Sequence, residues 1–435
     1  MTLKRTLNRF DDFSRRAFVS RAACGMLGLG AMPWITRAAA AQAQDPTISL
    51  GPATARNVIY LYMSGGMSQL DTFDPKPGKE TQGPTEVVGS NVDGIQVSGH
   101  LANMSRLMDR VAVVNSVNSN QGAHAQGRYF MHRSYAMRGT IQHPSLGAWL
   151  SHVGGRANPT LPAHVSVGGD IYGPSAGFFP PADGPLPIGD PEAGLQNSAL
   201  PQGVSEDAFA RRLSRVEQMN QAFADKYDHR LVGAYAEMYD QAVKLMRSSD
   251  LAAFDLNEEP DALRDAYGRD SFGQGCLLAR RLIEHDVRFV EVVNGGWDTH
   301  DQNFERLEEK VPELDRALSA LLGDLEARGM LEETLVVLAT EFGRTPDIVA
   351  GRNGRNHYPR AFTCLLAGGG VRGGQRYGQT DAEGREIVEN PVTVPDFNAT
   401  IAHALGLPVG QEVISPSGRP FTVADKGKPV TALFA

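Results

Sequence analysis

The chain has 435 residues, a formal net charge of −8 and three cysteines. An acidic chain lacks the basic footprint of a nucleic-acid-binding protein, so we expect no nucleic-acid partner. Three cysteines exclude a scaffold held together by disulfides, and the length allows one large domain or two smaller ones.

The first 43 residues have the features of a twin-arginine export signal, in the right order. Arg15 and Arg16 precede an apolar run from Ala22 to Ile35, and alanines follow, with cleavage expected after Ala41 or Ala43. The apolar run is shorter than the roughly 20 residues that span a bilayer, although an uncleaved anchor is the alternative. We therefore expect a periplasmic or extracytoplasmic protein without stable membrane insertion after cleavage. Its net charge changes from −8 to about −13, because the signal carries seven Lys or Arg and two Asp or Glu.

The rest of the chain predicts a tether over residues 44–55 and a single α/β domain over residues 56–435. The expected strands are compact apolar runs at residues 57–63, 110–116, 287–293, 334–340 and 362–367. The expected helices cover residues 101–108, 205–223, 231–246, 271–284, 303–328 and 396–405. Such an alternation indicates a mostly parallel central sheet with helices on both faces. Residues 154–260 are expected to form an irregular or helical insertion at the flank of this domain.

Polar side chains follow the expected strands, where open α/β sheets bind their ligands. Asp71 follows the first strand, and Ser116 and His124 follow the second. The remaining candidates come after the third and fourth strands and are Asp298, His300, Glu341, Arg344 and His357.

These residue types are those of a metal site with oxygen and nitrogen ligands. The candidate ligands for a zinc, manganese, calcium or magnesium ion are Asp71, Asp298, His300, Glu341 and His357. Three other residues are candidates for catalysis: Arg344 to bind an anionic group, His124 as an acid, base or outer-shell partner, and Ser116 as a nucleophile. Each has a structural alternative. Asp298 caps a helix in that interpretation, His300 points to solvent, and Glu341 forms a local ion pair with Arg344.

Several long motifs lie along the mature chain. They are Ser64–Lys76 (SGGMSQLDTFDPK), Gly295–His300 (GGWDTH), Thr340–Pro346 (TEFGRTP), Gly354–Pro359 (GRNHYP) and Leu366–Gly370 (LAGGG). With these motifs the chain resembles domain of unknown function family 1501 over most of its mature length. That family is similar to the alkaline phosphatase and sulfatase superfamily. The resemblance implies an alkaline-phosphatase-like α/β fold with metal ligands at strand ends, acting on phosphate or sulfate esters. It implies that Asp298, His300 and His357 hold one ion.

The chain departs from the superfamily pattern in three places. Ser64-Gly-Gly ends the first strand where the superfamily has a ligand Asp, and Glu341-Phe342 replaces an Asp-His pair. No residue is marked as the usual nucleophile. Two hypotheses therefore remain: an exported metal-dependent hydrolase of sulfate or phosphate esters with an anionic small-molecule or glycan substrate, or a non-catalytic protein that binds a sulfated glycan or a protein partner.

The export signal makes the first testable prediction. Replacing both Arg15 and Arg16 by Lys should leave the precursor in the cytoplasm, because the paired arginines are the recognition feature of this route. Fractionation followed by immunoblotting measures it. Undiminished export of the double variant would contradict the twin-arginine assignment.

Overall fold

The computed structural model describes residues 48–435 apart from 170–172, 197, 199, 201 and 228–239. The expected export signal, the start of the tether and most of the helix expected over residues 231–246 lie outside the described residues. The end of the tether packs on the domain, because the backbone nitrogens of Gly51, Thr54 and Ala55 donate to carbonyls of Ala404 and Gly406.

A nine-stranded sheet in the order β12-β4-β11-β8-β1-β7-β5-β6, with β15 beside β4, forms the centre of the protein. The strands are β1 (Asn57–Met63), β4 (Val111–Asn118), β5 (His164–Val167), β6 (Leu186–Ile188), β7 (Phe289–Asn294), β8 (Thr334–Ala339), β11 (Phe362–Ala367), β12 (Gln375–Tyr377) and β15 (Val392–Thr393). Every pairing is parallel except those of β11 with β4 and β8. All five expected strands lie in this sheet, so the mostly parallel architecture is confirmed.

The described residues also form four two-stranded antiparallel sheets outside the central sheet. They are β2 (Val87–Gly89) with β3 (Gln96–Ser98), β9 (Gly343–Arg344) with β10 (His357–Tyr358), β13 (Gln379–Thr380) with β14 (Ile387–Glu389), and β16 (Val413–Ile414) with β17 (Pro420–Phe421). The 3-10 helices are Glu80–Gln82, Met104–Arg106, Met108–Arg110, Pro181–Asp183, Ser249–Phe254, Leu256–Glu258 and Thr431–Leu433.

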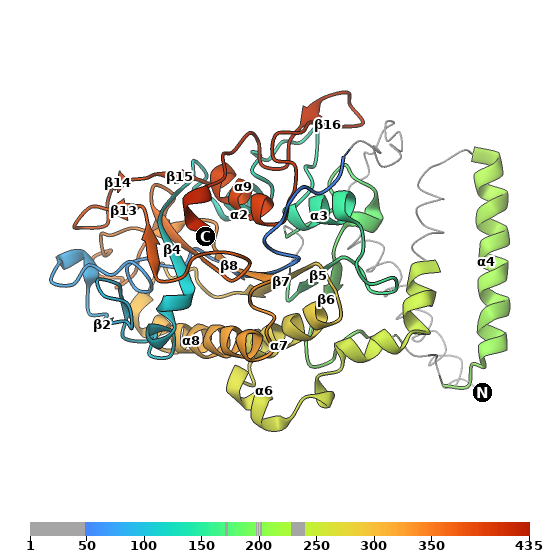
Figure 1. The fold of residues 1–435 in the computed structure, drawn as a ribbon, viewed down its shortest axis with the longest axis horizontal. Helices are drawn as coiled ribbons and strands as arrows, with labels where there is room; N and C mark the ends of the chain where they lie inside the picture. The colour runs from blue at the N-terminus through green and yellow to red at the C-terminus, as the bar shows by residue number, and fades with distance from the viewer. Residues whose placement is uncertain (1–47, 170–172, 197, 199, 201, 228–239) are drawn as a thin grey trace.

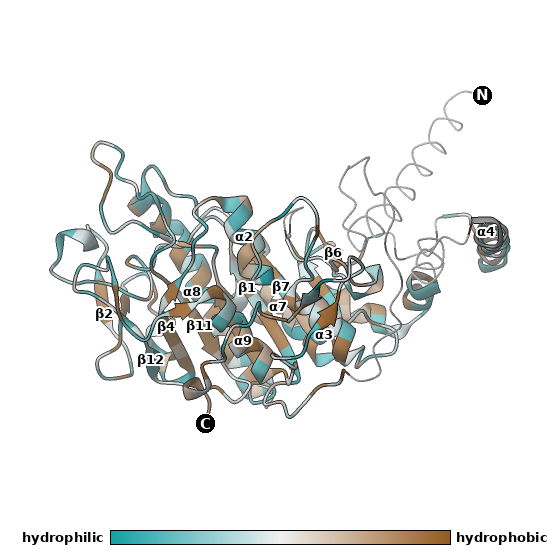
Figure 2. Cartoon of the chain, turned by 90° about the horizontal axis from the view of Figure 1, so that it is seen from above, coloured by the Kyte–Doolittle hydropathy of each residue, from teal (hydrophilic) through white to brown (hydrophobic). Residues whose placement is uncertain are grey.

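Helices cover both faces of the sheet (Figures 1 and 2). Successive side chains of a strand point to opposite faces, so Ile59, Leu61 and Met63 of β1 pack in one core and Val58, Tyr60 and Tyr62 in the other. The first core contains α7 (Ser271–Glu284), α8 (Asn303–Ala327) and the short α6 (Asp261–Tyr267). The second contains α2 (His124–Arg133), α3 (Leu146–Gly154) and α9 (Val394–Ala404).

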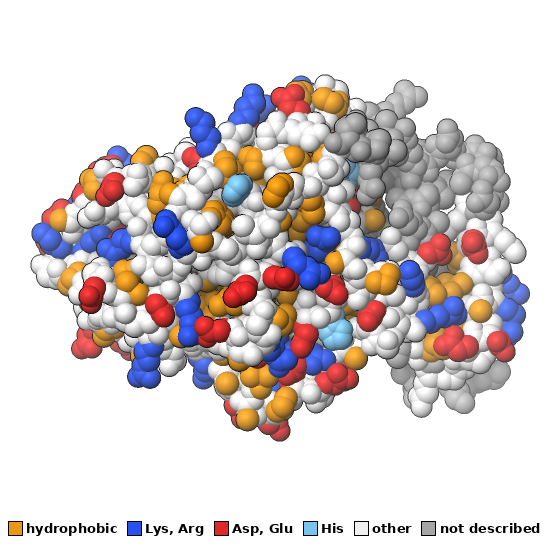
Figure 3. Space-filling view, viewed as in Figure 1, with side chains coloured by type: hydrophobic (Ala, Val, Ile, Leu, Met, Phe, Trp, Pro, Cys, Tyr) orange, Lys and Arg blue, Asp and Glu red, His pale blue; other side chains and the backbone are white. Residues whose placement is uncertain are grey.

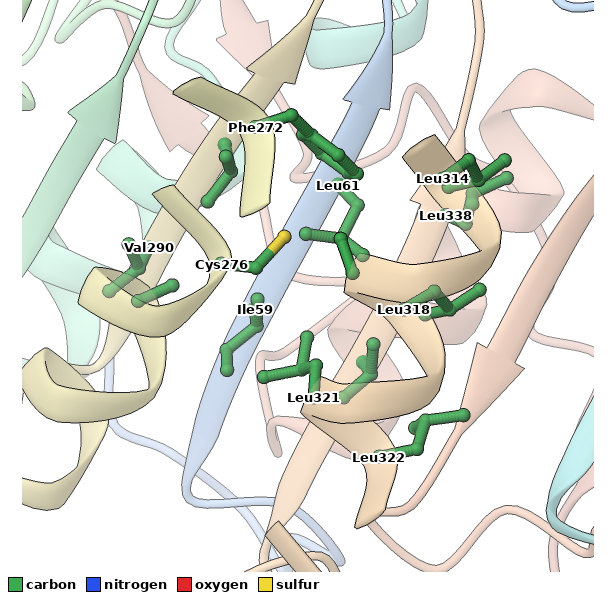
Figure 4. Close-up of a cluster of buried hydrophobic side chains, with 14 of the residues drawn as sticks. Ile59, Leu61, Phe272, Cys276, Val290, Leu314, Leu318, Leu321, Leu322 and Leu338 are labelled. Carbon is green, nitrogen blue, oxygen red and sulfur yellow. The ribbon is translucent and has the colours of Figure 1, made fainter. Parts of the chain in front are cut away.

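The local sequence explains where these helices begin. Asp270 accepts a hydrogen bond from the backbone nitrogen of Gly273 at the start of α7, and Thr393 and Asp396 form a reciprocal capping box at the start of α9. The apolar stripe of α8 and Cys276 of α7 close over Ile59 and Leu61 (Figure 4). Cys276 and Cys364 are both buried free thiols.

Two expectations for the flanks differ from the structure. Residues 101–108 do not form an α-helix: two 3-10 helices, Met104–Arg106 and Met108–Arg110, occupy this region. Arg106 and Leu107 donate to the carbonyls three residues back, and the backbone nitrogens of Asn103 and Met104 donate to the carboxylate of Asp315. Residues 154–260 are not purely irregular or helical, because β5 and β6 extend the sheet beyond β7. The long helix α4 (Glu206–Tyr227) stands away from the main body (Figure 1).

None of the described helices combines the length and the apolarity needed to cross a membrane. On the face drawn in Figure 3, basic and acidic side chains are interspersed.

Candidate metal centre

Four segments bring polar side chains to one edge of the sheet. β4, β8, β1 and β7 run in the same direction, so their carboxyl ends share that edge. Asp298 and His300 follow β7, Glu341 follows β8, and His124 begins α2 after β4. β11 runs in the opposite direction, so the chain just before it, which carries His357, reaches the same edge.

Asp298 lies at the centre of three histidines. Its Oδ1 atom is 3.1 Å from Nε2 of His300 and 3.5 Å from Nε2 of His357. Its Oδ2 atom is 3.4 Å from Nε2 of His124. The Nε2 atoms of His300 and His357 are 2.9 Å apart, and ligand atoms of His124, Asp298 and His357 all lie within 4.8 Å of one another.

The other ring nitrogen of each histidine faces an oxygen atom. Nδ1 of His124 is 2.9 Å from Oε1 of Glu341, and Nδ1 of His357 is 2.8 Å from the backbone oxygen of Gly122. Nδ1 of His300 is 3.1 Å from Oδ1 of Asn356. Because these oxygens accept, each Nδ1 carries a hydrogen, and Nε2 is the ring nitrogen that faces Asp298 and is placed to bind a metal ion.

This donor set fits a divalent metal ion. Three imidazole nitrogens and a carboxylate oxygen are ordinary zinc ligands, and bonds of about 2.0–2.1 Å in a tetrahedron place ligand atoms about 3.3 Å apart. Four of the distances between these atoms run from 2.9 to 3.5 Å. The ligand atoms that all lie within 4.8 Å of one another belong to His124, Asp298 and His357, and His300 adjoins them through Asp298 and His357. Burial, followed by the charge of Arg344, lowers the pKa of His357, which keeps its Nε2 atom unprotonated near neutral pH. Oxygen and backbone partners at Nδ1 are the usual outer shell of a metal-bound histidine.

Glu341 lies behind His124 and is fully buried. It accepts hydrogen bonds from the hydroxyl of Tyr62 at 2.9 Å and the backbone nitrogen of Gly65 at 2.9 Å. Burial alone would raise the pKa of Glu341, but the hydrogen bonds from His124 and Tyr62 outweigh it and the pKa lies below its usual value. Glu341 is therefore an ionised carboxylate that orients His124.

Arg344 is buried against the loop after β1. Its guanidinium donates to the carbonyls of Gly65, Gly66 and Arg355 and to Oδ1 of Asp298. Burial raises the pKa of Asp298, yet the hydrogen bond from Arg344 outweighs it and the pKa is lowered. Both glycines have positive φ, and a Cβ atom on Gly65 would lie 2.5 Å from the backbone nitrogen of Asp298. Only glycine allows this close approach.

Two candidates from the sequence lie elsewhere. Asp71 is fully buried and pairs with Arg355 at 2.8 Å, with further hydrogen bonds from Ser68, Thr85 and Asn303. Ser116 is also buried, and its hydroxyl donates to the backbone oxygen of Asn390 at 2.6 Å. Asp298 caps no helix, since the residue before α8 is Gln302, and the acidic partner of Arg344 is Asp298 rather than Glu341.

Sequence reasoning did not single out Arg128. It lies four residues after His124 on α2, on the same helix face. Its guanidinium donates to the hydroxyl of Ser64 at the end of β1 and lies 5.9 Å from the ring centre of Tyr62. The four-residue spacing between His124 and Arg128 places both on one helix face, but this can be concluded only when the helix is known to begin at His124.

The sequence matches the family described as "Protein of unknown function (DUF1501)" over residues 55–434, and the chain belongs to that family. No match was found among curated proteins.

Solved structures with a similar overall arrangement include three bacterial proteins. A sulfatase from Pseudoalteromonas sp. is 13% identical with a TM-score of 0.39, covering 86% of this chain and 73% of its own. A phosphonate monoester hydrolase from Silicibacter pomeroyi is 11% identical with a TM-score of 0.34, covering 87% and 76%. A protein in the alkaline phosphatase superfamily from Vibrio parahaemolyticus is 10% identical with a TM-score of 0.37, covering 97% and 79%.

Because Asp71 is buried and paired with Arg355, we expect it to stabilise the fold and not to bind a metal ion. Asp71→Asn should lower the free energy of unfolding by about 3–5 kcal/mol, because it leaves the buried guanidinium of Arg355 without its counter-charge. Denaturant unfolding measures this change. Asp301→Asn is the matched control, since the exposed pair of Asp301 with Arg352 should contribute about 1 kcal/mol or less. A folded Asp71→Asn protein that has lost its metal would contradict the structural role.

Proposed function

We propose that the protein is an exported metal-dependent hydrolase of phosphate or sulfate esters. The observation that carries this proposal is the 2.9 Å approach of the Nε2 atoms of His300 and His357 beside the carboxylate of Asp298. With hydrogens on both Nδ1 atoms, two lone pairs at this distance repel each other unless a proton or a metal cation lies between them. The side chain of Asp298 is 47% exposed, so a substrate reaches the site from solvent.

His124, Asp298, His300 and His357 are the residues that would hold the ion. When bound, a divalent metal at such a site polarises an ester oxygen and lowers the pKa of a bound water. Glu341 fixes the ring of His124, Asn356 the ring of His300, and the backbone oxygen of Gly122 the ring of His357. These partners keep each Nε2 atom directed at the centre before a substrate arrives.

Arg128 is better placed than Arg344 to bind the anionic group of such a substrate. The donors of Arg344 hold Gly65, Gly66, Arg355 and Asp298, and the side chain has no exposed surface. Arg128 is half-buried, and its contact with Ser64 places it beside the loop that also binds Glu341. A guanidinium and a hydroxyl together donate well to the oxygens of a phosphate or sulfate group.

The ligand assignment predicts a loss of metal binding on substitution. His300→Ala should lower metal affinity by more than the roughly 10–100-fold that an outer-shell change costs, and any esterase activity should fall with it. Elemental analysis after dialysis against the metal measures stoichiometry. His403→Ala is the control, because His403 is exposed on α9 and should keep the wild-type content. Stoichiometric metal in folded His300→Ala would contradict the assignment, and metal binding without any ester hydrolysis would favour a binding protein.

The anion assignment predicts a separate effect. Arg128→Gln should leave the metal content unchanged but weaken inhibition by inorganic phosphate about 10-fold or more, since a charged hydrogen bond contributes about 1.5–3 kcal/mol. The same loss should appear mainly in KM when a phosphate monoester is hydrolysed. Arg56→Gln, an exposed arginine before β1, is the control. Equal inhibition constants for wild type and Arg128→Gln would contradict the role of Arg128.

A further inference from the structure

A second group of ionisable side chains lies deep in the protein, on the sheet face covered by α2, α3 and α9. It lines a small pocket, part of which is open to solvent, with about 10 Å³ available to the centre of a water molecule, which is room for about one water. Its polar lining includes Tyr60 from β1, Glu291 from β7 and His132 from α2, and Met131 and Gly147 form part of the apolar wall. None of these residues belongs to the candidate metal centre.

The register of the neighbouring strands β1, β7 and β5 places three polar side chains in one row. Tyr60 is opposite Glu291, and Glu291 is opposite Ser166 of β5, so the three side chains lie side by side on one face. The residues Tyr60 and Glu291 are 2% and 1% exposed. An ionisable row at such depth is unusual in an otherwise apolar core, because an unpaired buried charge or polar group is costly.

Part of this cost is offset by the pair of His132 with Glu291. Nδ1 of His132 is 2.8 Å from the backbone oxygen of Arg128, and its Nε2 atom is 3.0 Å from Oε1 of Glu291. A carbonyl oxygen accepts at the first nitrogen, so a hydrogen must also lie between the second nitrogen and the carboxylate. The pair holds this proton jointly and is neutral overall, whichever of the two atoms carries it.

The remaining polar atoms are not satisfied by protein groups. Among the described residues, the hydroxyl of Tyr60 and Oε2 of Glu291 have no hydrogen-bond partner although both are buried. Both ring nitrogens of His164 share this property. Its ring packs against Gly147, where a Cβ atom would lie 2.6 Å from Cε1 of His164. Burial lowers the pKa of His164 to about 3, so its ring is neutral and offers one donor and one acceptor.

We infer that this pocket is an internal binding site for ordered water, with one molecule accepting from Tyr60 and donating to Glu291. A phenol and a carboxylate oxygen are complementary to a water molecule, which is both acceptor and donor. The shared proton leaves the His132–Glu291 pair neutral, so the pocket carries no net charge that would select an ion. The water then completes the network that ties α2 to β7.

Radical labelling tests the inference inside one molecule. X-ray pulses convert bound water to hydroxyl radicals in place, and a methionine beside that water is oxidised to its sulfoxide. Met131 lines the pocket and Met108 lies in the opposite core, and both have no exposed surface. We expect Met131 to be oxidised at least about fivefold faster than Met108, and equal rates would overturn the inference.

The thermal stability of a substituted protein provides a second test. Tyr60→Phe removes only the hydroxyl, so a hydrated pocket loses a hydrogen bond and Tm falls by roughly 1–3 °C. In a dry pocket the same change removes a buried unpaired group, and Tm stays the same or rises. Tyr267→Phe is the reference, because its hydroxyl donates directly to Asp324 and Tm should fall in either case. An unchanged or raised Tm for Tyr60→Phe would overturn the inference even if the proposed hydrolase activity is demonstrated.

Discussion

The crowding of three histidine side chains around one carboxylate, at the carboxyl edge of the sheet, is the constraint on which the proposed site depends. The Nε2 atoms of His124, His300 and His357 each lie within 3.5 Å of the carboxylate of Asp298, and the partners of their Nδ1 atoms hold the rings in this orientation. Arg344 donates to Asp298 from one side. In the proposed function a divalent cation would lie among these groups, whose atoms are ordinary ligands for zinc.

The residues around the candidate metal centre hold its loops in position. Gly65 and Gly66 let the loop after β1 approach the segment after β7, and Arg344 ties the two together. Behind them, the buried pair of Asp71 with Arg355 fixes the strand that presents Asn356 and His357. Several residues that look like ligands in the sequence are therefore supports, since a buried ion pair with full hydrogen bonding is costly to break.

The architecture was readable from the sequence because its strands are continuous apolar runs and its helices carry clear apolar stripes. Phe362–Ala367 and Ser271–Glu284 have the bounds that their patterns predict. The short strands β5 and β6 were not readable, since three or four residues show no periodicity, and β5 joins the sheet through β7, which is distant in the chain. At residues 101–108 the expected α-helix is replaced by 3-10 turns, in which Arg106 and Leu107 donate to the carbonyls three residues back. The local apolar spacing does not distinguish these two kinds of turn.

For the candidate site, the sequence predicted the types of residue involved but not which of them lie together. Strand ends indicated Asp298, His300 and His357, but nothing local distinguished them from Asp71, whose partner Arg355 is distant in sequence. The role of Glu341 depends on His124, and the position of Arg128 depends on where α2 begins. X-ray absorption spectroscopy of the zinc-loaded protein tests whether these residues hold a metal ion. A centre formed by His124, Asp298, His300 and His357 should show about three imidazole ligands and one carboxylate oxygen at about 2.0–2.2 Å. A protein that binds no zinc, or a spectrum with one imidazole or none, would contradict this assignment.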